Sequence, residues 1–354
     1  MFKTIGIMTA WNQDSGVAMH SKPIVYSWLK MGYEVVIFSF IKEDFHGRVI
    51  WDEYDEPFVI RCFGTSGGTN FLDPRPFLLE KYDIFVVQDL KMLPMDNLAK
   101  IFHHIKKKAK ATIHVIHENT VEGSFEPPQP PSFYAFDWDA VVYFDKRQES
   151  FVKAIYGDKA HYIPFPAYPL RKVDKDKARE ELNLPKDKKI VLVYAIGGYT
   201  PYLPDLPDPE LDDIHFLILT RKPIRVKYKN VEVRSPPPLR DEDLDKYVGA
   251  ADAVILHKVR TPLVPLALKS SAAYQLMGLG VPLLVPSISE FFIEFNNEVL
   301  KYTDRHHLKE LILDAVNLGE KTKKTLEAAK KFVEEHSPEK IGKMFIDLFH
   351  KLIG

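Results

Sequence analysis

Short apolar runs alternate with amphipathic segments along the first half of the chain. The runs are rich in Val, Ile, Phe and Tyr and are mostly apolar at successive positions, which is typical of strands buried on both faces of a parallel sheet. They predict strands over Thr4–Met8, Glu34–Phe40, Phe58–Phe63, Asp83–Val87, Thr112–His117, Ala140–Phe144 and His161–Pro164. Helical spacing over Lys22–Met31 and Met95–Lys108 indicates βαβ units and a doubly wound sheet.

Pro23 falls near the start of the first predicted helix. Proline has no backbone N–H and is favoured at the first helical position, where that group has no partner. We therefore expect Ser21 to cap this helix and residues 16–20 to form an extended loop before it.

The same pattern starts again in the second half. It predicts strands over Lys188–Ala195, His215–Thr220, Val231–Arg234, Ala253–Leu256 and Val281–Val285. It predicts helices over Asp174–Leu182, Asp241–Val248, Ser271–Leu279, Leu308–Leu318 and Thr322–Glu335, with a last helix starting at Pro338. A proline-rich stretch without any hydrophobic periodicity separates the two halves. We expect an α/β fold of two Rossmann-like doubly wound domains, residues 1–168 and 169–336, facing across a cleft.

The overall charge is balanced. Lys and Arg number 48 against 49 Asp and Glu, a formal net charge of −1, which argues against a nucleic-acid binder whose whole surface is basic. The single cysteine, Cys62, excludes an internal disulfide framework and a multi-cysteine zinc site. The N-terminal residues lack a long apolar stretch, and no run of about 18 apolar residues occurs. These features predict a cytoplasmic protein.

Several segments resemble those of GT-B fold glycosyltransferases, especially the family 4-like group. The first strand is followed by Asp14-Ser15-Gly16-Val17-Ala18-Met19-His20 and, after a helix, by Gly32-Tyr33-Glu34-Val35. Later, Tyr247-x-x-Ala250-Ala251-Asp252-Ala253 and Met277-x-x-Gly280-x-Pro282 are similar to second-domain motifs of that group. The similar segments follow the family's order over nearly the whole chain.

This resemblance implies transfer of a sugar from a nucleoside diphosphate sugar, with no further cofactor and no metal. In the family the donor binds mainly to the second domain, the acceptor binds mainly to the first, and the anomeric configuration is retained. The resemblance also implies that the helix within residues 337–354 crosses back to the first domain. The acceptor is expected to be a sugar, another small molecule or a lipid-linked compound.

Two features of the family pattern are missing. Counted back from Pro282, the usual Glu-x7-Glu pair is replaced by Ala267 and Gln275. The Arg and Lys that commonly follow the first strand of the second domain are also absent. A non-catalytic GT-B relative acting as a binding or regulatory subunit is therefore the alternative function. A nucleotide-sugar epimerase is a further one, whereas a nicotinamide dehydrogenase is disfavoured because its glycine fingerprint is missing.

Most candidate donor residues follow predicted strands, because open α/β sheets bind ligands at the carboxyl ends of their strands, and the others stand at or in a predicted helix. Helix N-termini and basic side chains suit a diphosphate, and an amide can still hydrogen-bond a hydroxyl. The alternative for each is an ordinary turn, a helix cap or a solvated surface charge. The candidates are Gly16, Val17, Gly197, Gly198, Arg221, Lys222, Lys258, Lys269, Ser270, Ser271 and Gln275.

Candidate catalytic residues close a strand of the first domain. His117 and Glu118 stand at the end of the predicted strand Thr112–His117, and the family has a histidine here beside the transferred sugar. Such groups can orient a hydroxyl or assist proton transfer; the alternative is a core histidine bonded to backbone. On the acceptor side we expect His20, Gln88 and Asp89.

The helix predicted over Met95–Lys108 is basic and amphipathic. Its lysines and those just after it, within Lys100–Lys110, indicate a peripheral contact with the inner face of a membrane, which would suit a lipid-linked acceptor. The alternative is a solvated, lysine-rich face of an ordinary packed helix. The triplet Asp137-Trp138-Asp139 directly precedes a predicted strand, so we expect a turn there rather than a metal site.

Overall fold

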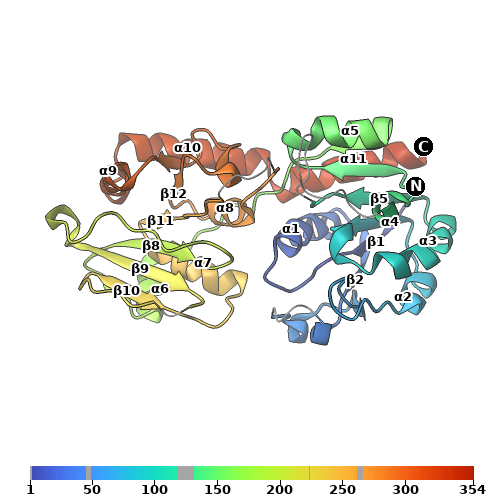
Figure 1. The fold of residues 1–354 in the computed structure, drawn as a ribbon, viewed down its shortest axis with the longest axis horizontal. Helices are drawn as coiled ribbons and strands as arrows, with labels where there is room; N and C mark the ends of the chain where they lie inside the picture. The colour runs from blue at the N-terminus through green and yellow to red at the C-terminus, as the bar shows by residue number, and fades with distance from the viewer. Residues whose placement is uncertain (1, 45–48, 119–130, 223, 261–265) are drawn as a thin grey trace. The chain divides into compact units, whose positions relative to one another are not determined.

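The computed structural model describes residues 2–44, 49–118, 131–222, 224–260 and 266–354. The chain forms two compact units. Unit 1 comprises Met1–Pro166, Leu263–Ala267 and Pro338–Gly354, and unit 2 comprises Ala167–Pro262 and Leu268–Ser337. Each unit is built on a parallel sheet with helices packed on it (Figure 1). The predicted class, an α/β fold of two doubly wound, Rossmann-like sheets, is confirmed.

The described part of unit 1 contains a seven-stranded parallel sheet in the order β3-β2-β1-β4-β5-β6-β7. Its strands are β1 (Thr4–Met8), β2 (Glu34–Phe40), β3 (Val59–Phe63), β4 (Ile84–Gln88), β5 (Ala111–Val115), β6 (Ala140–Tyr143) and β7 (Ala160–Tyr162). The strand order reverses between β1 and β4. The loops after these two strands therefore flank the switch point of unit 1, where open α/β sheets bind ligands.

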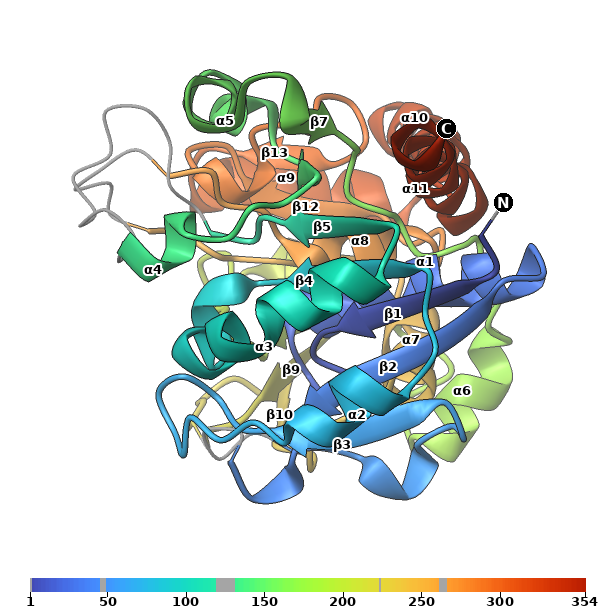
Figure 2. The same ribbon diagram turned by 90° about the vertical axis from the view of Figure 1, so that its right-hand side faces the viewer.

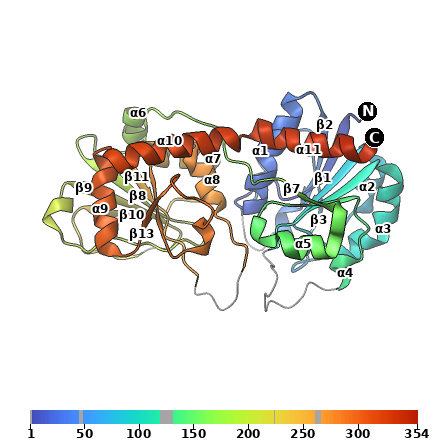
Figure 3. The same ribbon diagram turned by 90° about the horizontal axis from the view of Figure 1, so that it is seen from above.

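Helices pack on both faces of this sheet. They are α1 (Gly16–Lys30), α2 (Pro74–Leu79), α3 (Met95–Lys108), α4 (Pro131–Tyr134), α5 (Glu149–Tyr156) and α11 (Pro338–Ile353). Figure 2 shows α2 and α3 on one face of the sheet. In the core of this unit, Phe38 stacks on Phe77 with ring centroids 4.4 Å apart. On the other face α1 and α11 lie side by side (Figure 3), and Trp28 Nε1 donates to the carbonyl of Gly342 at 3.1 Å.

The first helix begins earlier than the sequence suggested. It starts at Gly16, Ser15 is its N-cap with an Oγ that accepts a backbone N–H at 3.2 Å, and Pro23 lies inside it. The expectation that Ser21 caps the helix and that residues 16–20 are extended is therefore wrong. The Ser15 cap and the buried helix face that starts before Pro23 outweigh the single hydrogen bond that proline removes.

The described part of unit 2 contains a six-stranded parallel sheet in the order β10-β9-β8-β11-β12-β13. Its strands are β8 (Lys189–Ala195), β9 (Ile214–Thr220), β10 (Val231–Arg234), β11 (Ala253–Ile255), β12 (Leu283–Pro286) and β13 (Leu300–Tyr302). Its helices are α6 (Lys175–Glu181), α7 (Asp241–Ala250), α8 (Ser271–Met277), α9 (Arg305–Val316) and α10 (Glu320–Glu335). The strand order reverses between β8 and β11, so the loops after these strands flank the switch point of unit 2.

Candidate functional site

An open turn follows β8 at the switch point of unit 2. It carries Gly197 and Gly198 at φ angles of 68° and 89°, in the left-handed region that favours glycine. Among the described residues, none apart from chain neighbours has a heavy atom within 4 Å of a Cβ added at either glycine. The amide of Thr200, two residues on, donates to the carbonyl of His257 at 3.0 Å, which ties this turn to the loop after β11.

Lys258, in the loop after β11, is a partly buried cation. Its ammonium lies 5.1 Å from the ring centroid of Tyr199 and 4.2 Å from that of Phe291. Burial lowers the pKa of this lysine. Within the described ranges no carboxylate forms an ion pair with it. The two aromatic faces compensate part of the buried charge, but the ammonium still has N–H donors to offer a ligand.

Lys269, by contrast, is already paired. Its side chain is only 8% exposed, its ammonium forms an ion pair with Glu294 Oε2, and it donates to the hydroxyl of Tyr274 at 3.2 Å. The Glu294 carboxylate neutralises the Lys269 charge that was predicted to bind a diphosphate. Lys258 is therefore the better placed of the two cations for binding an anion.

Ser270 and Ser271 mark the start of α8. Ser270 is the N-cap: its Oγ accepts a backbone N–H of the first turn at 3.2 Å and is also hydrogen-bonded with the hydroxyl of Tyr199. Ser271 is the first helical residue. The start of α8 is thus attached to the loop after β8, on the side of the sheet where Lys258 lies.

Arg221 and Lys222 come directly after β9 and are exposed. Thr220 fixes this turn, because its Oγ1 accepts from the amide of Lys222 at 3.2 Å and donates to the carbonyl of Lys222 at 3.1 Å. Since β9 pairs with β8 in the parallel sheet, both basic residues lie at the carboxyl edge that also carries Lys258.

The two positions that replace the family's Glu pair are both buried. Gln275, on α8, is 1% exposed. Its Nε2 donates to Asp241 Oδ1 at 2.8 Å, and its Oε1 has no hydrogen-bond partner among the described residues. Ala267 is 4% exposed. The amide of Gln275 is therefore directed at α7 rather than at solvent.

A buried hydrogen-bond network in unit 1 joins α1 to the carboxyl ends of β4 and β5. The atom Gln88 Oε1 lies 2.9 Å from His20 Nδ1 and 2.9 Å from His117 Nε2. Because an amide oxygen can only accept, both imidazoles carry a proton on these nitrogens. Burial lowers the pKa of His20 to about 3 and that of His117 well below its usual value, so both rings are neutral at neutral pH.

The second nitrogens of these two rings are therefore hydrogen-bond acceptors. Nε2 of His20 is buried and has no partner among the described residues. The whole His20 side chain is enclosed, whereas His117 is partly exposed at the end of β5. Of the two, Nδ1 of His117 is the acceptor that a ligand could reach.

Glu118 is turned toward the backbone. Its Oε1 accepts from the amide of Lys91 at 3.0 Å and its Oε2 from the amide of His117 at 3.1 Å. Burial raises the pKa of this carboxyl. Asp89, two residues before Lys91, has a φ of 57°. Glu118 thus joins the loop after β4 to the end of β5 and fixes the position of His117.

The start of α1 lies at the other side of the same switch point. Gly16 is exposed and Val17 is buried. Both lie in the first turn of α1, where the backbone N–H groups have no hydrogen-bond acceptor within the helix. The loop before it is held by Trp11, whose Nε1 donates to Glu56 Oε2 at 2.9 Å and whose carbonyl accepts from Arg61 Nη2 at 3.2 Å.

Three of the five lysines in the Lys100–Lys110 segment, Lys106, Lys108 and Lys110, contact other parts of unit 1. Lys106 pairs with Asp137 at 2.8 Å and with Asp139 at 3.1 Å, and Lys110 pairs with Asp83 at 2.9 Å. The contact with a membrane stays a prediction. In the part of the chain that the structure describes, no helix is long and apolar enough to span a membrane.

The two aspartates of the Asp137-Trp138-Asp139 triplet form ion pairs and hydrogen bonds within unit 1. Asp137 pairs with Lys106 and Lys159, and Asp139 Oδ2 accepts from the amide and the hydroxyl of Thr112, both at 2.8 Å. Over the described ranges, no group of three or more His, Cys, Asp or Glu side chains is placed to hold a metal ion.

The aromatic side chains at the switch point of unit 2 were not predicted from the sequence. Tyr202 stacks on His257 with ring centroids 4.0 Å apart, and His257 Nδ1 lies 2.6 Å from the hydroxyl of Tyr302. Tyr199 and Phe291 flank the partly buried lysine. The signal for Tyr199, Tyr202 and His257 was their place just after predicted strands. Phe291 and Tyr302 gave none, because only tertiary structure brings them here.

No known family model matches the chain. Solved structures match it over nearly its whole length. Sucrose-phosphate synthase from Thermosynechococcus elongatus is 15% identical, with a TM-score of 0.60 over 99% of each chain. An E. coli structure named for trehalose-6-phosphate and bound with UDP-2-fluoro glucose is 10% identical, with a TM-score of 0.56 over 98% of each chain. WaaG, a glycosyltransferase involved in lipopolysaccharide biosynthesis, is 10% identical, with a TM-score of 0.56 over 98% of this chain and 99% of that one.

At these identities the likeness concerns the fold. Both sheets of the present chain are parallel and doubly wound, and the matches extend through both units. The chain therefore has the fold of the GT-B glycosyltransferases.

Proposed function

We propose that this protein is a glycosyltransferase whose donor is a nucleoside diphosphate sugar, with the diphosphate bound at the switch point of unit 2. The side chain of Lys258 carries the proposal. It is a partly buried cation without an ion pair among the described residues, next to the open Gly197-Gly198 turn. A diphosphate would supply the missing negative charge, and the amides of an open glycine turn allow phosphate oxygens to approach closely. A structure of the same fold contains UDP-2-fluoro glucose.

On the acceptor side we assign His117. Its Nδ1 is an unprotonated acceptor that can orient a sugar hydroxyl, and the ring is held by Gln88 and by the Glu118 contact to its backbone. The neutral His117 ring can therefore position a substrate but supplies no positive charge. The resemblance to the family 4-like group adds the expectation that transfer retains the anomeric configuration and needs no metal.

A non-catalytic relative is the second candidate. The observation that favours it is the state of Gln275, which is buried and bound to Asp241, while Ala267 offers no polar group. Neither position supplies a carboxylate. Such a relative would bind the nucleotide sugar and leave it intact.

The first experiment is a calorimetric titration of the full chain with UDP, GDP and ADP in the presence of EDTA. We expect one nucleotide to bind, and Lys258→Gln to weaken its binding by about tenfold or more, because hydrogen bonds to charged groups contribute roughly 1.5–3 kcal/mol. Lys229→Gln is the matched control, since Lys229 is exposed and precedes β10 at the opposite, amino edge of the sheet. Absence of binding by all three nucleotides, or equal effects of the two variants, would refute the donor site.

A second experiment separates the two candidate functions. The protein is incubated with sugar derivatives of the nucleotide that binds, and release of the nucleoside diphosphate is measured with and without candidate acceptors. Release that depends on an acceptor supports the glycosyltransferase. Binding of the nucleotide sugar without any release supports the non-catalytic relative.

A further inference from the structure

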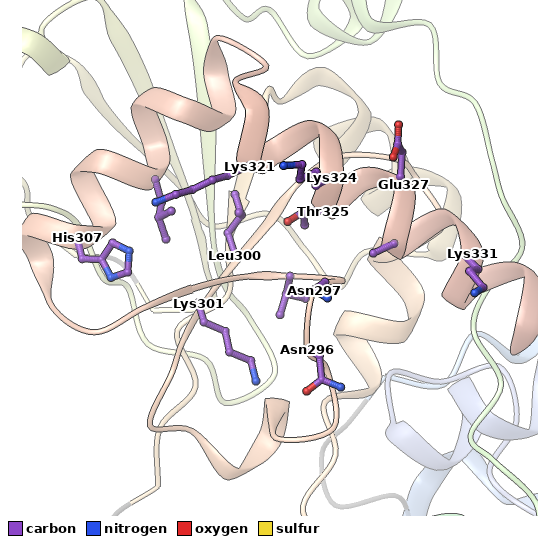
Figure 4. Close-up of a pocket in the computed structure, with 13 residues that line it drawn as sticks. Asn296, Asn297, Leu300, Lys301, His307, Lys321, Lys324, Thr325, Glu327 and Lys331 are labelled. Carbon is purple, nitrogen blue, oxygen red and sulfur yellow. The ribbon is translucent and has the colours of Figure 1, made fainter.

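A polar pocket lies in unit 2, apart from all the donor candidates. Figure 4 shows it between α10 and the chain that leads into and through β13. Its volume is about 680 Å³. None of the residues assigned above to the donor is among those that line it.

The pocket walls combine basic, amide and apolar groups. Lys321, Lys324 and Lys331 line it from α10, where their spacing places them on one side of the helix. Lys301 on β13 lines the opposite wall, together with the amides of Asn296 and Asn297. The buried side chains of Leu300 and Leu311 form an apolar part of the lining.

These walls carry an excess of positive charge. Glu327 is the acidic residue among those that line the pocket, against four lysines. Within the described parts of the chain, neither Lys301 nor Lys321 forms an ion pair. Burial lowers the pKa of Lys301, and the nearby charge of Glu298 opposes this shift only in part.

The other two lysines have only weak partners. Lys324 pairs with Glu320 at 3.3 Å and Lys331 pairs with Glu335 at 3.8 Å, each one turn away on the exposed surface of α10. Exposed pairs of this kind contribute little to stability, and their long side chains can turn toward a ligand. All four ammonium groups are therefore available to an anion.

We propose that this pocket binds a phosphate ester. Several ammonium groups on facing walls suit the doubly charged phosphate, and the asparagine amides can both donate to and accept from hydroxyl groups of the same ligand. The pocket volume falls within the range of small-molecule sites, roughly 300–1,000 Å³, which leaves room for a sugar phosphate. A soluble sugar phosphate and the headgroup of an anionic lipid share this chemistry.

The first arm of the test is a calorimetric titration of the full chain with glucose 6-phosphate at constant ionic strength. We expect saturable binding that becomes about tenfold weaker or more in the double variant Lys301→Gln/Lys321→Gln, because two charge-assisted contacts are removed. The matched control is Lys323→Gln/Lys330→Gln. Both of its lysines are exposed on α10 and neither lines the pocket, so it removes the same charge and should bind like the wild type.

The second arm is co-sedimentation with phosphatidylcholine vesicles that do or do not contain phosphatidic acid. Binding to phosphatidic acid alone, lost in the pocket variant and kept in the control variant, assigns the site to a lipid headgroup. Binding of glucose 6-phosphate with the same dependence assigns it to a soluble ester. The proposal is overturned if neither probe binds, if the pocket variant binds like the wild type, or if both variants lose binding equally.

Discussion

At the scale of single residues, the imidazoles of His20, His114 and His117 in unit 1 are neutral in the folded state. Burial lowers the pKa of His20 and of His114 to about 3, and that of His117 well below its usual 6.5. In the unfolded chain each takes up a proton near pH 6.5. Below that pH the unfolded state binds more protons than the folded state, and the free energy of unfolding must decrease.

We therefore expect the free energy of unfolding to fall between about pH 7.5 and about pH 5.5, by about 1.4 kcal/mol for each buried histidine. The stability is present above the unfolded pKa and is lost as the pH falls toward the folded value. Urea unfolding at both pH values measures the loss. His114→Phe should remove one histidine's share, whereas His306→Gln, at a side chain 83% exposed, should not. Equal losses in all three proteins would contradict the prediction.

A second prediction at this scale concerns Gln275. Gln275→Glu would place two carboxylates in buried contact, because the amide now donates to Asp241 Oδ1. We expect it to lower the free energy of unfolding at neutral pH by about 1–3 kcal/mol, and the difference from wild type to shrink as acid protonates the pair. Thermal unfolding at two pH values checks this, and Gln275→Ala is the control that should show no such recovery.

The sequence could locate many site residues but not their partners. Lys258 and His117 could be placed at strand ends, since the apolar runs before them predict the strands. The pairing of Lys269 with Glu294 could not be foreseen, because the two residues are distant in the chain and meet only in the folded unit. The functional roles of all the site residues stay predictions.

At the scale of elements, the strands that are buried on both faces are the ones that the hydrophobic pattern predicts best. β1 and β2 were predicted at their observed bounds, because each is apolar on both faces. β13 was missed, since Leu300–Tyr302 is too short to show a period and has a lysine at its centre. The N-terminus of α1 was predicted wrongly because Pro23 indicates a helix start, whereas the Ser15 cap and the packing of the buried face begin the helix at Gly16.

The contact between α1 and α11 gives a prediction of its own. A Cβ added at Gly342 would lie 2.4 Å from Ser27 Oγ, which is buried without a hydrogen-bond partner among the described residues. Gly342→Ala should therefore lower the free energy of unfolding by about 1–3 kcal/mol through overpacking. Adding Ser27→Ala should recover part of the loss in the same urea titration. A gain in stability, as for alanine at an open helix position, would show that the helices are not in close contact.

At the scale of the whole molecule, α11 follows unit 2 in the chain but belongs to unit 1. Phe345 of α11 is buried, with its ring centroid 5.8 Å from that of Trp28. All four tryptophans of the chain, Trp11, Trp28, Trp51 and Trp138, are in unit 1. Their fluorescence therefore reports on the unfolding of unit 1.

We expect Phe345→Ala to shift the fluorescence-detected urea transition to lower concentration, with a loss of about 3–5 kcal/mol as for other buried phenylalanines. Met344→Ala on the same helix is the control, because Met344 is 39% exposed and should change the transition little. Equal shifts in the two variants would contradict the placement of α11 in the core of unit 1.

The position of α11 in the chain also has a consequence for folding during synthesis. The ribosome releases the strands of unit 1 first, yet the helix that packs beside α1 is translated only after all of unit 2. Until then, Trp28 and the apolar side chains around it have no covering helix. Unit 2 can therefore complete its core before unit 1 does, although domains generally fold in the order of their synthesis. A nascent chain stalled before Pro338 should accordingly be a client for chaperones that bind exposed apolar surface.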